Sequence, residues 1–98
     1  MPIANVQEEG GWIKVYDENS KKIAQMSSSG VEVLGIASDF FVTEIGGWIK
    51  TFDQNCKKIA QMSSTNIAVI SAAGQTFTTK EGSWTKIYDK NCKKISQR

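Results

Sequence analysis

The sequence predicts an all-β fold built from three internal repeats of about 36 residues. Trp12, Trp48 and Trp84 are evenly spaced, and residues 10–26, 46–62 and 82–98 align without a gap. Val, Ile, Thr and aromatic residues fill the apolar positions, and turn-forming residues interrupt them at short, regular intervals. Because these intervals are too short for stable helices, we expect strands alone.

A chain of 98 residues is expected to form a single domain, residues 1–98, with repeats at 1–29, 30–65 and 66–98. The second repeat divides into four short strands, at 31–37, 40–45, 47–53 and 57–62. The first repeat has no counterpart of segment 31–37. The sequence therefore predicts eleven strands, with an incomplete first unit.

The last two strands of each repeat are predicted to form a hairpin with a three-residue loop, a type I turn followed by a left-handed residue. In the first repeat this loop places Asp17 opposite Lys21. One face of the hairpin is then aliphatic, and the other carries aromatic and lysine side chains. The expected pairs are Val15 with Ile23, Ile13 with Gln25, Tyr16 with Lys22, Lys14 with Ala24, and Trp12 with Met26.

The left-handed position of this turn carries Ser20, Cys56 and Cys92 instead of the usual glycine. A side chain there costs about 1 kcal/mol, so either the cost is tolerated or the side chains are kept for a purpose. In a threefold arrangement, equivalent positions lie too far apart for a disulfide within the chain. We therefore expect Cys56 and Cys92 to be free thiols.

Three near-equal units indicate a closed threefold β domain, such as a β-prism or β-trefoil. The segment from Trp48 to Asp53, with Lys58 to Gln61, loosely resembles the end of a repeat in β-prism lectins of the monocot type. However, the Gln-x-Asp-x-Asn-x-Val-x-Tyr mannose motif of those lectins is absent from all three units. The alternatives are blades of a β-propeller completed by an oligomer, and a repetitive sheet or roll.

Composition limits the function classes. The net charge is +2, too small to indicate nucleic-acid binding, and the chain has no histidine and only two cysteines. The usual general base and zinc ligand are therefore missing, so we expect no enzyme, no metal site and no cofactor. No signal peptide or membrane span is evident, so we expect the cytoplasm by default, with secretion left open and no membrane partner.

Each repeat places a lysine between two aromatic residues on one hairpin face, where the aromatic rings are platforms for a ligand or packing for the domain. We interpret the chain as a non-catalytic, multivalent, lectin-like module that binds a carbohydrate or another small ligand. The alternative is an assembly protein that forms homo-oligomers through its open repeat edges. The candidate ligand-binding residues are Trp12, Lys14 and Tyr16; Trp48, Lys50 and Phe52; and Trp84, Lys86 and Tyr88.

Overall fold

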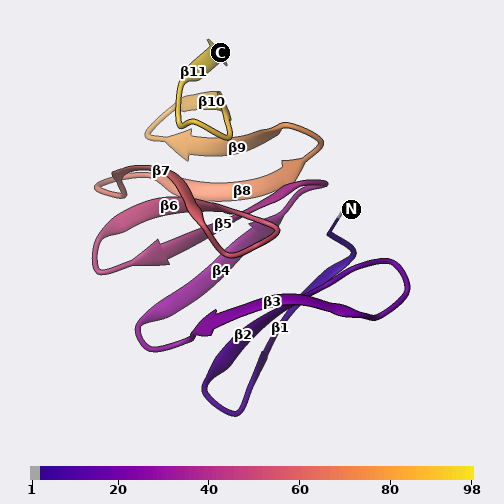
Figure 1. The fold of residues 1–98 in the computed structure, drawn as a ribbon. Coiled ribbons are helices and arrows are strands. Elements are labelled where there is room, and N and C mark those ends of the chain that lie inside the picture. The colour runs from indigo at the N-terminus through magenta and orange to yellow at the C-terminus, as the bar shows by residue number, and fades with distance from the viewer. Residues whose placement is uncertain (1–2) are drawn as a thin grey trace.

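The computed structural model describes residues 3–98, so the first two residues of the first repeat lie outside it. This part of the chain forms eleven strands and no helix, as expected, and hence has no helix that could cross a membrane. The strands form three antiparallel sheets of three, four and four strands (Figure 1). Each sheet corresponds to one sequence repeat, and the first sheet lacks one strand.

The strand bounds agree with the expected segments to within about one residue. The first sheet contains β1 (Asn5–Glu9), β2 (Trp12–Tyr16) and β3 (Lys22–Ser27). The second contains β4 (Val31–Ile36), β5 (Phe40–Ile45), β6 (Trp48–Asp53) and β7 (Lys58–Ser63). The third contains β8 (Ala68–Ala73), β9 (Thr76–Glu81), β10 (Trp84–Asp89) and β11 (Lys94–Gln97). The strands of each sheet follow chain order, because short turns join neighbours.

The predicted three-residue turn is confirmed in all three hairpins. Ser20, Cys56 and Cys92 have φ angles of 63°, 62° and 61°, in the left-handed region. In the first turn, the backbone N–H of Ser20 donates to the carbonyl of Asp17 at 3.0 Å, and the N–H of Asp17 donates to the carbonyl of Lys21 at 2.9 Å. The same two hydrogen bonds recur in the other two turns.

Beyond the turn, the predicted hairpin register is wrong by one residue. Tyr16 pairs with Lys22 as expected, but Val15 pairs with Ala24 instead of Ile23. A bulge leaves Ile23 as an extra residue, and the other two hairpins have the same irregularity. The pairs that follow shift with it: Lys14 pairs with Gln25, Ile13 with Met26, and Trp12 with Ser27, in place of Lys14 with Ala24, Ile13 with Gln25, and Trp12 with Met26.

The bulge has a packing reason. In a regular ladder Ile23 and Met26 would point to opposite faces, but the extra residue allows both to pack in one hydrophobic cluster with Ile13 and Val15. We call this side of a sheet, and its equivalents, the aliphatic face. The opposite side, which carries Trp12, Lys14, Tyr16 and their equivalents, is the aromatic–lysine face.

Two hydrophobic clusters join the three sheets in chain order. In the first, Phe41 and Phe52 of the second sheet pack on the aliphatic face of the first sheet. In the second, Phe77 and Tyr88 of the third sheet pack on the aliphatic face of the second, where the rings of Phe40 and Phe77 meet edge to face with centroids 6.4 Å apart. Each later sheet thus places its aromatic–lysine face on the aliphatic face of the sheet before it.

This arrangement differs from the closed threefold domain expected from the sequence. Within residues 3–98, neither hydrophobic cluster joins the first sheet to the third. The molecule is elongated, with extents of 39 × 25 × 17 Å, and Figure 1 shows the sheets following one another from the indigo end to the yellow end. Only the second sheet therefore has hydrophobic packing on both faces.

The backbones of the second and third sheets lie close together at β4 and β8. A Cβ atom added to Gly35 in β4 would lie 3.0 Å from the Cβ of Ala72 in β8. Since real Cβ atoms are rarely so close, a side chain at Gly35 would push the two strands apart. The second and third sheets therefore meet most tightly at their first strands, which we call the inner strands.

We predict that Gly35→Val lowers the free energy of unfolding by about 1–3 kcal/mol, because the new side chain overpacks the contact between β4 and β8. Ser71→Val is the matched control: Ser71 holds the equivalent position in β8 and is exposed. Urea denaturation of both variants measures the difference. Equal effects of the two substitutions would contradict the close packing of the inner strands.

Candidate functional site

The three tryptophans occupy equivalent, half-exposed positions. Each is the first residue of its strand, directly after a two-residue turn, so all three lie at the same end of their sheets. Their exposed fractions are 45% for Trp12, 44% for Trp48 and 51% for Trp84. The indole rings are therefore only half covered by the protein, and part of each ring is available to another molecule.

Two of these tryptophans each have a glutamate as their cross-strand neighbour, which is absent from the candidate residues predicted from the sequence. The two-residue turns place Glu9 directly opposite Trp12 and Glu81 directly opposite Trp84, whereas Ile45 lies opposite Trp48. The Gly10-Gly11 pair, a typical two-residue hairpin turn, was a signal that could have revealed this register.

Glu81 is the centre of a hydrogen-bonded network in the third sheet. The hydroxyl of Tyr88 donates to Glu81 Oε2 at 2.7 Å, and Lys86 Nζ donates to Oε1 at 3.0 Å. Thr79 Oγ1 donates to Oε2 at 3.2 Å. Burial by itself would raise the pKa of Glu81, but these three hydrogen bonds outweigh it and hold the pKa below its ordinary value. Burial, followed by the hydrogen bond to Glu81, raises the pKa of Tyr88 to about 12.

The first sheet has an exposed version of this network. Tyr16 donates to Glu9 Oε2 at 3.2 Å, and Lys14 Nζ lies 3.8 Å from Glu9 Oε1. Partial desolvation, together with the charge and hydrogen bond of Glu9, raises the pKa of Tyr16. Because no other sheet of residues 3–98 packs on this face of the first sheet, its polar groups are open to water.

Two of the candidate aromatic residues lie inside the fold. Phe52 stacks on Phe41 with centroids 5.6 Å apart, and Tyr88 stacks on Phe77 with centroids 5.5 Å apart. Both pairs belong to the clusters between sheets, so their rings stabilise the stack and do not face a ligand. Among the nine candidates, the structure leaves the three tryptophans exposed, and keeps Lys14, Lys50, Lys86 and Tyr16 partly accessible.

The aspartate of each hairpin accepts hydrogen bonds within its own turn. Asp17 Oδ1 accepts hydrogen bonds from the backbone N–H groups of Asn19 and Lys21 at 2.8 Å and 3.0 Å. Asp53 and Asp89 accept the same pair of bonds in the other hairpins. These carboxylates thus stabilise the turns of their own hairpins.

The two thiols are free and partly buried. Cys56 packs in the cluster between the first and second sheets, and Cys92 in the cluster between the second and third. Burial, followed by the charge of a neighbouring aspartate, raises the pKa of Cys56, and burial likewise raises the pKa of Cys92. Both cysteine side chains therefore contribute to the packing between sheets.

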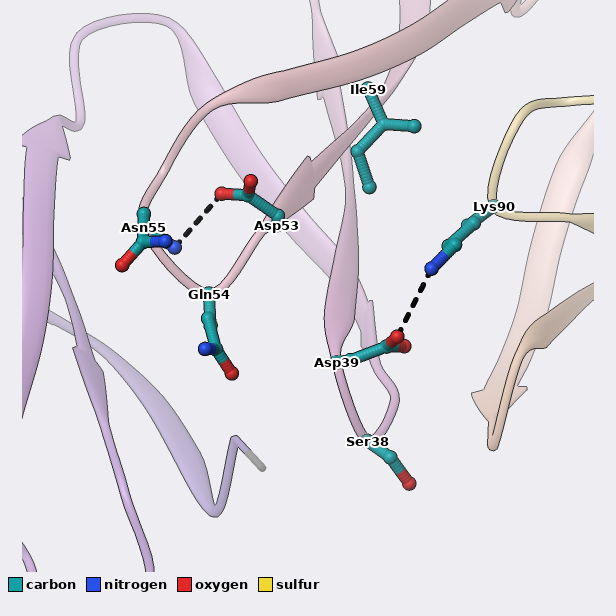
Figure 2. Close-up of a pocket in the computed structure, with 7 residues that line it drawn as sticks. All are labelled: Ser38, Asp39, Asp53, Gln54, Asn55, Ile59 and Lys90. Carbon is teal, nitrogen blue, oxygen red and sulfur yellow. Dashed lines mark hydrogen bonds and ion pairs between the residues drawn. The ribbon is translucent and has the colours of Figure 1, made fainter. Parts of the chain in front are cut away.

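A surface hollow lies between the turns of the second and third sheets (Figure 2). Its main charged groups neutralise each other, because Lys90 Nζ bonds to Asp39 Oδ2 at 3.1 Å. Burial would raise the pKa of Asp39, but hydrogen bonding, chiefly from Lys90, brings it below the ordinary value. Thr51 Oγ1 also donates to the carbonyl of Lys90 at 2.7 Å. The polar residues around this hollow therefore connect the second sheet to the third.

Across residues 3–98, no group of three or more histidine, cysteine, aspartate or glutamate side chains is arranged to hold a metal ion. No protein-family model, curated protein or solved structure matches this chain. The assignment of a candidate site therefore rests on geometry alone. Each sheet has a half-exposed tryptophan at its end, and in the first and third sheets a glutamate and a lysine lie near it.

We predict that Tyr88→Phe lowers the free energy of unfolding by about 1–2 kcal/mol at about pH 7, because it removes a hydrogen bond to a charged carboxylate. Tyr16→Phe is the matched control, and we expect a smaller loss because its network is exposed. The contribution of Glu81 is present above its ordinary pKa of 4.5 and is lost as the pH falls through its lower folded-state pKa.

Urea unfolding of both variants at about pH 7 and at successively lower pH values measures this dependence. The loss caused by Tyr88→Phe should shrink as the pH falls through the folded-state pKa of Glu81, because the carboxylate then becomes protonated. A loss that does not change with pH, or a Tyr16→Phe variant that loses as much at about pH 7, would contradict the role of the network.

Proposed function

We propose that this chain is a non-catalytic, multivalent binding module, lectin-like in style, that takes a carbohydrate or another small ligand with one apolar face. The observation that supports it is the half exposure of Trp12, Trp48 and Trp84 at equivalent positions. Pyranose rings present an apolar face that stacks on an indole, while their hydroxyl groups need hydrogen-bonding partners.

The contrast with the other large aromatic side chains supports this proposal. Phe40, Phe41 and Phe77 are fully buried, so the fold is able to cover aromatic rings where packing requires it. The tryptophans have larger apolar surfaces, yet each remains about half exposed. Exposed indole is typical of binding surfaces, because the ring offers a wide apolar face together with a hydrogen-bond donor.

The polar neighbours make the three positions unequal. Glu9 with Lys14, and Glu81 with Lys86, supply acceptors and donors beside Trp12 and Trp84. The second sheet has Ile45 in place of the glutamate, so Trp48 has a more apolar surrounding. We infer that the first and third sheets carry the stronger sites, and that weak sites on one rigid stack bind a multivalent target by avidity.

The finer architecture that we propose is an open arc of three blades, as in a β-propeller, instead of a closed prism or trefoil. Close approach of the inner strands β4 and β8 supports sheets that converge at one side of the molecule. Completion of a ring by further copies has less support. Polar residues occupy the outer faces of the first and third sheets at positions where the second sheet has apolar ones: Asn5 corresponds to Phe41, and Thr76, Thr78 and Thr85 correspond to Phe40, Val42 and Ile49.

We predict that a carbohydrate ligand quenches the intrinsic tryptophan fluorescence, and that titration against a broad glycan panel detects it. Trp12→Leu and Trp84→Leu should each weaken binding to an immobilised glycan several-fold more than Trp48→Leu. The reason is that Trp12 and Trp84 each have a neighbouring glutamate, whereas Trp48 has Ile45. Ile70→Ser, which alters an exposed apolar side chain of β8, is the matched control. No quenching by any glycan, or unchanged binding in all three variants, would overturn the proposal.

A further inference from the structure

Among residues 3–98, the first sheet has no counterpart of the inner strands β4 and β8. In the second and third sheets, β4 pairs with β5 and β8 pairs with β9, whereas β1, the counterpart of β5 and β9, pairs only with β2. The other edge of β1 therefore presents backbone N–H and C=O groups without a strand partner among residues 3–98. Such an edge is a template for pairing with another chain.

A groove lies where the missing strand would fit. It separates the first sheet from β4, and its apolar lining is contributed by both walls, with a glutamate on each side. The residues that line it are Val6, Glu8, Ile13, Val31, Glu32 and Val33. Val6, Val31 and Val33 are only partly buried, which leaves apolar surface for an incoming strand to cover.

A second observation marks the same place. Ile36 in β4 is the counterpart of Ala72 in β8, and Ala72 is covered by the neighbouring inner strand at Gly35. In the part of the chain that the structure describes, no inner strand of the first sheet covers Ile36, whose exposed fraction is 37%. A strand at the position of the inner strand of the first sheet would cover this exposed isoleucine side chain.

We propose that this groove, which we call the inner slot, binds an extended strand from another polypeptide chain. The incoming strand pairs antiparallel with β1 and packs against β4, as β4 and β8 do in the complete sheets. The residue of this strand that faces Ile36 is small, as Gly35 is where it meets Ala72 in the complete sheets. This inference is independent of the tryptophan surface and of any ligand bound there.

The complete second sheet defines the expected register. There Val31 pairs with Ile45, Glu32 with Glu44, and Gly35 with Val42. If the incoming strand pairs with β1 in the same register, its residues equivalent to 31, 32 and 35 lie opposite Glu9, Glu8 and Val6. A lysine opposite Glu8 is favoured over a glutamate, because opposite charges stabilise a cross-strand pair and like charges destabilise it.

The outer edge strands β3, β7 and β11 are poorer candidates. An outer edge is present in all three sheets, so it marks no missing element. The inner slot differs because it combines a strand edge with an apolar wall supplied by β4. Backbone pairing and side-chain burial then act together on the same incoming strand.

The probe is a synthetic peptide with the sequence of residues 30–38, carrying Glu32→Lys and a fluorescent label, added to the full chain. We expect saturable binding by anisotropy, and at least tenfold slower amide exchange along β1 with unchanged exchange along β3, β7 and β11. The unmodified peptide should bind more weakly, and a peptide with Val33→Pro should not bind, since proline cannot join the ladder.

Two protein variants test the slot itself. Ile36→Lys should weaken peptide binding at least tenfold, whereas Ile95→Lys, an exposed isoleucine in β11, should leave it unchanged. Glu8 is exposed on β1, so Glu8→Lys is expected to leave the fold intact. This variant should bind the unmodified glutamate peptide more tightly than the lysine peptide. It therefore tests the slot even if Ile36→Lys fails to fold.

No binding at millimolar peptide, protection of an outer edge strand instead of β1, or a peptide preference that ignores the charge at Glu8 would each overturn the proposal.

Discussion

The structure depends on one repeated contact, in which the aromatic–lysine face of a sheet packs on the aliphatic face of the sheet before it. Phe41 and Phe52 make this contact for the second sheet, and Phe77 and Tyr88 make it for the third. Each burial removes large apolar surfaces from water, which is the dominant favourable term in folding. A three- or four-stranded sheet with one apolar face has little stability alone, so the contacts between sheets determine the fold.

The same contact explains how the candidate site is distributed. Packing covers the inner part of the aromatic–lysine face in the second and third sheets, and the tryptophan at the end of each sheet remains about half exposed. In the third sheet, the network around Glu81 makes the polar part of the interface compatible with burial, because Lys86 and Tyr88 both donate to its carboxylate. The first sheet has the same side chains in Glu9, Lys14 and Tyr16, but open to water.

Much of this fold could be predicted from the sequence, because its signals are local. The strands follow from short runs of β-branched and aromatic residues, and the left-handed turn positions follow from the three-residue loop of each hairpin. The bulge at Ile23 could not be predicted, since it exists to place Ile23 and Met26 in one cluster with another sheet. For the same reason, the burial of Phe52 and Tyr88 and the open stack depend on contacts between repeats, and the sequence pattern of a single repeat does not encode them.

The sheets stack in a row, with the second sheet packed on both faces. Amide hydrogen exchange tests this arrangement most directly, because protection follows local burial and the free energy of opening. We expect the amides of β5 and β6 to exchange more slowly than those of β1 and β2 and those of β9 and β10. Equal protection of all three sheets, as a closed threefold domain would give, would contradict it.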